Sequence, residues 1–80
     1  MQNNILGPAI LAEVRAEMAR RQVTRRSIAE ATDSDPATVG NWLSGKTPIR
    51  LRDLLTICDV LGVMPEALYE RARATVEDVA

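Results

Sequence analysis

The chain has 80 residues, a hydrophobic fraction of 46% and a formal net charge of −1. This length suits one small domain, residues 1–80, and leaves no room for a second core. The sequence holds no apolar run near the roughly 18 residues of a membrane span, and one cysteine without any histidine excludes an internal disulfide and an ordinary zinc site.

The aromatic content predicts an all-α fold with an aliphatic core, since there is no Phe, one Trp and one Tyr, and alanine favours helix. Charge is unevenly distributed: residues 1–52 carry a net +3 and residues 53–80 a net −4. Phosphate attraction is screened over about 8–10 Å at physiological salt, so the local charge matters more than the total. A basic end that contacts nucleic acid fits this pattern, and an ordinary mixed surface is the alternative.

The N-terminal segment 1–6 shows no helical period, and we expect a flexible arm there. It lacks the pattern of a secretion signal, so we expect a cytoplasmic protein. Gly7-Pro8 opens a helix over 8–21, with proline at or near its first position. The residues that face the core are Ile10, Leu11, Val14 and Met18, and those outside this stripe are Glu13, Glu17, Arg20 and Arg21.

The next segment reads as two short helices joined by a tight turn, at 25–32 and 36–44. Thr24 is a good N-cap for the first helix, and Asp35 caps the second. Pro36 fits the first helical position, where no N–H is missed. Asp33 tolerates the left-handed backbone that the turn requires. This order is the helix-turn-helix pattern.

The run SIAEATDSDPATVGNWLSGKTPI, residues 27–49, resembles the DNA-binding motif of the lambda repressor/Cro-like (XRE) family. The residues that carry the resemblance are Ala29, Val39, Trp42, Gly45 and Lys46, followed by LLTICDVLGV, which is similar to the family's fourth helix and its glycine cap. The resemblance covers roughly residues 10–70. It implies a five-helix fold that binds double-stranded DNA.

Several cations stand where a DNA phosphate would suit them. Arg25 and Arg26 occupy the first turn of a helix, which is the wrong end for positive charge unless an anion lies there. Gly45 is a candidate C-cap, and we expect free N–H groups after it. The predicted phosphate contacts are Thr24, Arg25, Arg26, Ser44, Lys46, Thr47, Arg50 and Arg52. Solvated surface arginines are the alternative.

The helix 36–44 is the predicted reading element, because its outward face is small and uncharged and suits a major groove about 12 Å wide. Asn41 suits an adenine edge, and Ala37 suits a thymine methyl. The predicted base-reading residues are Pro36, Ala37, Gly40 and Asn41. For Ala37 and Gly40, a role as plain helix filler is the alternative. The resemblance implies base contact at the positions of Pro36, Ala37 and Asn41, but Pro36 replaces a long polar side chain, so direct readout is expected to be sparse.

Two residues depart from the family together. The resemblance implies a buried ion pair at the positions of Met18 and Leu43, and here both residues are apolar. Apolar replacement of a buried ion pair is often neutral or stabilising. We therefore predict that Met18 and Leu43 are in contact.

The C-terminal half predicts helices at 50–61 and 65–77. In the first of these, Gly62 is the predicted C-cap, Cys58 is expected to be an inert core thiol, and the inward face is Leu51, Leu54, Leu55, Cys58 and Leu61. In the second, the apolar stripe is Leu68, Ala72 and Val76, with Met64 and Val79 nearby. Some of this stripe is expected to close the core. The rest of the stripe, with Tyr69, suits a homodimer seam, and a role confined to the core is the alternative.

These features predict a DNA-binding transcriptional regulator, most simply a small Cro/repressor-type protein of a phage or plasmid that binds an operator as a dimer. One alternative is the antitoxin of a toxin–antitoxin pair, whose acidic segment (Glu66, Glu70, Glu77, Asp78) meets a basic toxin. Another is a protein-interaction module on the same fold. The sequence gives no sign of catalytic residues, a metal, a cofactor or a small-molecule ligand.

Overall fold

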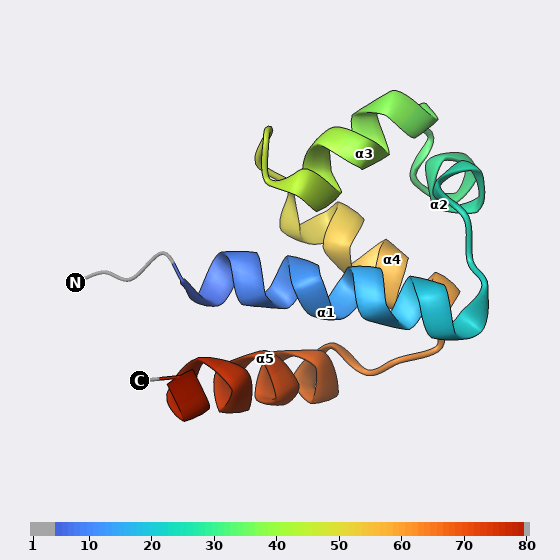
Figure 1. The fold of residues 1–80 in the computed structure, drawn as a ribbon. Helices are drawn as coiled ribbons and strands as arrows, with labels where there is room; N and C mark the ends of the chain where they lie inside the picture. The colour runs from blue at the N-terminus through green and yellow to red at the C-terminus, as the bar shows by residue number, and fades with distance from the viewer. Residues whose placement is uncertain (1–4, 80) are drawn as a thin grey trace.

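The computed structural model describes residues 5–79, and these form five helices and no strand (Figure 1). The helices are α1 (Leu6–Arg21), α2 (Arg25–Thr32), α3 (Pro36–Ser44), α4 (Leu51–Leu61) and α5 (Pro65–Val79). The predicted all-α, five-helix fold is confirmed. The bounds of α2 and α3 coincide with the predicted ones, and α5 extends past residue 77.

The start of α1 differs from the prediction, because Leu6 belongs to the helix rather than to a flexible arm. The first intrahelical hydrogen bond runs from the N–H of Ala9 to the carbonyl of Ile5. Pro8 is then the third residue of the helix. A backbone N–H at that position has no intrahelical acceptor, so proline, which lacks this N–H, loses no hydrogen bond there. Proline is therefore compatible with a helix that starts two residues earlier. Residues 1–4 of the predicted arm lie outside the described residues.

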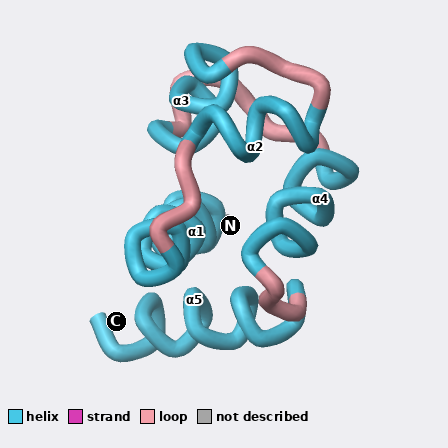
Figure 2. Tube along the Cα trace, turned by 90° about the vertical axis from the view of Figure 1, so that its right-hand side faces the viewer, coloured by secondary structure: helices cyan, strands magenta, loops and turns pink. Residues whose placement is uncertain are grey.

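The helices are arranged around α1 (Figures 1 and 2). Helix α5 packs against one side of α1, and α3 lies on the opposite side. Helix α2 contacts both α3 and α4. No helix among the described residues is both long and apolar enough to cross a membrane.

The core is aliphatic, as predicted, with Trp42 as its one aromatic side chain. Met18 and Leu43 both belong to this buried cluster, and their direct contact stays a prediction. The Cys58 thiol is buried, and its burial raises its pKa, which keeps it protonated. The buried apolar residues are Val14, Met18, Ile28, Ala29, Val39, Trp42, Leu43, Ile57, Cys58, Leu61, Leu68 and Ala72.

The predicted inward face of α4 is partly wrong. Leu51 and Leu55 are 69% and 42% exposed, whereas Ile57 is fully buried. The core-facing positions of α4 follow the i, i+3, i+4, i+7 spacing from residue 54, and Leu55 lies about 100° around the helix from Leu54, outside that stripe. Leu51 lies in the first turn, one turn before the buried stripe begins. The stripe is Leu54, Ile57, Cys58 and Leu61.

A buried carboxylate connects α1 to α5, contrary to the prediction that Glu17 lies outside the core-facing stripe. Glu17 is only 4% exposed, because α5 covers this side of α1. Its oxygens accept hydrogen bonds from Arg71 at 2.6 Å, Arg21 at 2.9 Å and Arg20 at 3.1 Å. These bonds, that from Arg71 foremost, lower the pKa of Glu17 to about 2.

Candidate nucleic-acid interface

The turn between α2 and α3 is held by the predicted local contacts. The Thr24 hydroxyl accepts the N–H of Ser27 at 3.1 Å, and the Asp35 carboxylate accepts the N–H of Thr38 at 2.8 Å. Asp33 adopts the left-handed conformation, with φ 56° and ψ 44°. These contacts fix the direction in which the chain enters α3. The predicted caps and the predicted turn residue are confirmed.

Helix α3 buries one face and exposes the other. Its inward residues, Val39, Trp42 and Leu43, are buried as predicted. Its outward side lies at an edge of the molecule, away from α1 and α5 (Figure 1). On that side Pro36, Ala37 and Ser44 are exposed, and Gly40 and Asn41 are half-buried. The face is small and uncharged, although Gly40 and Asn41 lie nearer the helix flank than the sequence predicts.

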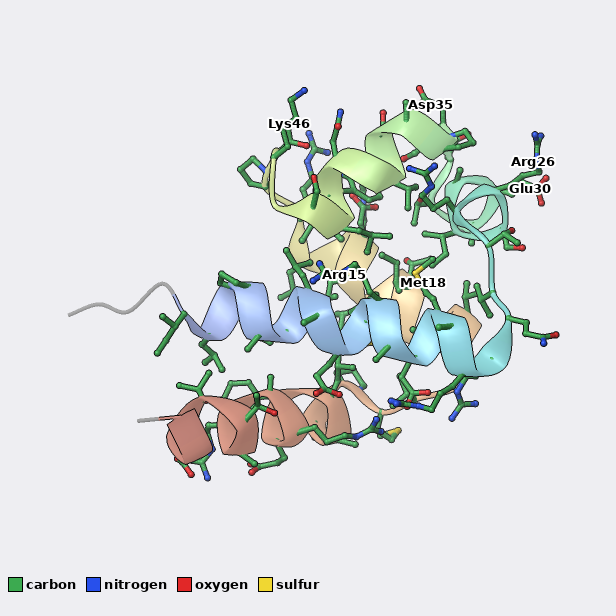
Figure 3. All side chains as sticks on the ribbon, in the orientation of Figure 1. Arg15, Met18, Arg26, Glu30, Asp35 and Lys46 are labelled. Carbon is green, nitrogen blue, oxygen red and sulfur yellow. The ribbon has the colours of Figure 1, made fainter. Side chains whose placement is uncertain are left out.

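The two arginines of α2 diverge. Arg25 is exposed and extends along α3, where its side chain lies against Gly40. Arg26 extends to the other side of α2, near Glu30 (Figure 3). The predicted phosphate contacts at 25 and 26 therefore lie on different sides of α2, and only Arg25 adjoins the face of α3.

The loop after α3 differs from the prediction, because its N–H groups are not free. Gly45 ends the helix with φ 82°, as predicted. However, the N–H groups of Gly45, Lys46 and Thr47 donate to the carbonyls of Trp42 and Asn41. These bonds satisfy the carbonyls of the last helical turn. The Lys46 side chain is exposed and points away from the body of the molecule (Figure 3). Only side chains of this loop remain for an anion.

The cations at the start of α4 have different surroundings. Arg50 is the N-cap residue, is exposed and makes no capping bond. The Arg52 guanidinium lies 3.7 Å from the carboxylate of Asp53, which is only 7% exposed. Asp53 therefore gives Arg52 a local partner at the helix end that favours negative charge. The sequence prediction for Arg52 did not consider this partner.

Arg15 is a cation near α3 that the sequence predictions omit. From α1 its guanidinium donates a hydrogen bond to the backbone carbonyl of Leu43 (Figure 3). Arg15 and Arg25 line the same surface hollow of about 390 Å³, together with Gly40, Leu43 and Ser44. One sequence feature indicates this position of Arg15. It lies three residues before Met18, and this i, i+3 spacing puts both residues on the side of α1 that faces α3.

The arrangement brings together a protruding helix with a small outward face and cations at its flank and C-terminal end. Arg25 lies at the flank, and Lys46 follows the end of the helix. Such a set suits an extended, negatively charged ligand whose groove accepts a helix. Among residues 5–77, no group of three or more potential metal ligands lies close enough together to hold an ion.

The comparisons with known proteins agree with this geometry. A helix-turn-helix domain family matches residues 9–72. One similar solved structure is the clp gene regulator ClgR from C. glutamicum, with a TM-score of 0.76 and 25% identity over 91% of this chain and 94% of that one. A comparison with curated proteins found no match. The chain belongs to the helix-turn-helix domain family, in its XRE-like form, and is a DNA-binding transcriptional regulator.

Proposed function

We propose that the chain is a small repressor of phage or plasmid type, which occupies a double-stranded DNA operator as a dimer and so excludes polymerase. The observation that carries this proposal is the exposed small face of α3, with Arg25 at its flank and Lys46 after its end. The match to a protein described as a gene regulator supports a role in transcription.

In the proposed complex, α3 enters the major groove. Asn41 is the reader of an adenine edge, and Pro36, Ala37 and Gly40 allow close approach to the bases. Because these side chains are short, sequence-dependent DNA shape carries much of the specificity. The proposed phosphate contacts are the side chains of Thr24, Arg25, Arg26, Ser44, Lys46, Thr47, Arg50 and Arg52.

We propose dimerisation through α5. Tyr69 of this helix is 44% exposed, and Met64, the residue directly before the helix, is exposed as well. An amphipathic aromatic residue with an accessible ring is typical of protein interfaces. A dimer of this kind reads two half-sites about 34 Å apart on one face of the duplex.

The antitoxin alternative has less support. Two of the acidic residues on which it depends, Glu70 and Glu77, lie 3.5 Å and 2.9 Å from Arg73 of the same helix. They are therefore already engaged on α5. Glu66 is exposed, and the side chain of Asp78 lies outside the described residues. A basic toxin would have to compete with Arg73 for this segment.

The proposal is tested by selecting a binding site from random duplexes and measuring affinity by fluorescence anisotropy from about 50 to 200 mM salt. We expect one preferred sequence, two chains per duplex and a steep log–log salt dependence. Because two chains bind each duplex, Arg25→Ala and Lys46→Ala are each expected to reduce the salt slope by about 2, which corresponds to one lost phosphate contact in each chain.

The matched control is Arg73→Ala, which removes the same charge from α5, on the far side of α1 from α3. It is expected to leave the slope unchanged. Equal effects of Arg73→Ala and Arg25→Ala, or no preferred duplex at any salt concentration, would contradict the proposal. A single chain per duplex would contradict the dimer.

A further inference from the structure

Gly40 stands in the middle of α3, where glycine has a cost. Glycine in a helix interior is less stable than alanine, because it loses more backbone freedom on folding, and Gly40 has no positive φ to explain its presence. The surroundings of its Cα give another reason. A Cβ at this position would overlap the Arg25 guanidinium, with the Cζ and Cδ of Arg25 at 3.5 Å and 3.7 Å.

Arg25 therefore occupies the space that a side chain at position 40 would fill. Its guanidinium lies across the flank of α3 and lines the hollow of about 390 Å³ that Arg15 also lines. Arg15 comes from α1 and is anchored on the carbonyl of Leu43. Two positive groups from two helices thus face one hollow.

Neither of these arginines has a carboxylate partner within the described part of the chain. Two like charges on one hollow repel each other, and an anion between them relieves that repulsion. A phosphate accepts charge-assisted hydrogen bonds from more than one guanidinium. The hydroxyl of Ser44, which also lines the hollow, is already bonded to the carbonyl of Asn41.

We propose that Gly40 is a positioning residue: because it has no side chain, it leaves room for Arg25 to lie against α3. In that position Arg25 and Arg15 together bind one phosphate of the DNA backbone. This inference rests on the proposed DNA binding at α3. It gives Gly40 a different role from base reading, and it adds Arg15 to the proposed contacts.

The test is a double-mutant cycle between Gly40→Ala and Arg25→Ala, with affinity for the selected duplex as the readout. Gly40→Ala displaces only the flexible end of Arg25, so we expect the thermal midpoint to stay the same or to rise with helix propensity. We expect Gly40→Ala to weaken binding about tenfold, because a charge-assisted contact is lost. In the Arg25→Ala background, Gly40→Ala is expected to have no further effect.

The matched control is Gly7→Ala, since Gly7 is also helical and a Cβ there would meet nothing within 4 Å. It is expected to bind like the wild type. Arg15→Gln is expected to weaken binding about tenfold as well, and to add less than its full effect to Arg25→Ala because both residues act on one phosphate.

Three results would overturn the inference. The first is wild-type affinity for Gly40→Ala. The second is a full additive loss in Arg25→Ala/Gly40→Ala, which would show that Gly40 meets DNA directly. The third is that inorganic phosphate raises the thermal midpoint of the wild type but not of Arg25→Ala, while the two proteins bind DNA equally well. The hollow would then bind a free anion rather than the DNA backbone. Absence of duplex binding by the wild type would instead contradict the proposed function itself.

Discussion

Glu17 is the residue whose environment departs furthest from the sequence expectation. Its carboxylate is buried between α1 and α5, and three half-exposed arginines bind it, Arg20 and Arg21 from α1 and Arg71 from α5. Their hydrogen bonds lower its pKa from about 4.5 to about 2. The contact with Arg71 of α5 spans 54 positions in the chain. Glu17 therefore contributes to the docking of α5 only while it is ionised.

This linkage predicts loss of stability in acid. The unfolded carboxylate binds a proton near pH 4.5, whereas the folded one remains ionised until about pH 2. Between these values the unfolded state binds more protons, so the free energy of unfolding falls as the pH falls from about 4.5 to about 2. Glu17→Gln is expected to be less stable at pH 7 and to lose much of this pH dependence. Urea unfolding at pH 7, 4 and 3 measures both effects.

Asp59→Asn is the control for Glu17→Gln, since it removes an exposed carboxylate from α4. We expect it to retain the wild-type pH dependence between pH 4.5 and 2. Equal acid sensitivity of Glu17→Gln and the wild type would show that the pairing with the arginines does not govern the docking of α5.

Residue-scale predictions succeeded where the cause is local. Thr24, Asp33 and Asp35 were identified because caps and left-handed turns depend on side chains within a few positions. The burial of Glu17 and Asp53 was missed because it depends on packing between helices. Gln22, which ends α1 with φ 57°, carries no comparable signal, since glutamine is not a typical left-handed residue.

At the scale of elements, the α2–turn–α3 unit was predictable because each boundary is marked in the sequence. Thr24 begins α2, Asp35 and Pro36 begin α3, and Gly45 ends it. The inward face of α4 was not predictable, because seven apolar residues in that helix, Cys58 included, allow two overlapping stripes. Only the packing of α4 against α2 and α1 selects Ile57 over Leu55. The expectation of free N–H groups after α3 was wrong for a local reason, since the chain after a glycine C-cap folds back onto the carbonyls of the last helical turn.

The cap of α3 gives a prediction at this scale. Asp35→Ala leaves the N–H of Thr38 without its acceptor, so we expect the free energy of unfolding to fall by about 1 kcal/mol. Asp35→Ser restores an acceptor at the same position and is expected to regain most of that stability. Chemical denaturation of the three proteins checks this. A serine variant as unstable as the alanine variant would mean that the lost charge, rather than the cap, explains the effect.

At the scale of the whole molecule, α1 separates two surfaces of different character. Helix α3 lies on one side of α1 and α5 on the other (Figure 2). Arg25 lies against Gly40 of α3, whereas α5 carries acidic residues. The unequal charge of the two halves of the sequence indicated this division. For Arg15 the i, i+3 spacing to Met18 indicates only the side of α1, because its nearness to α3 arises from the way α1 packs. In the proposed complex, DNA therefore lies on the α3 side alone.

The most direct test of this claim is an amide NMR titration of the ¹⁵N-labelled protein with the selected duplex. We expect the largest shift changes in residues 24–26 and 37–47, with the side chain of Asn41 among them. Only small changes are expected in the middle of α5. The largest changes in α5, with α3 unaffected, would contradict DNA binding through α3.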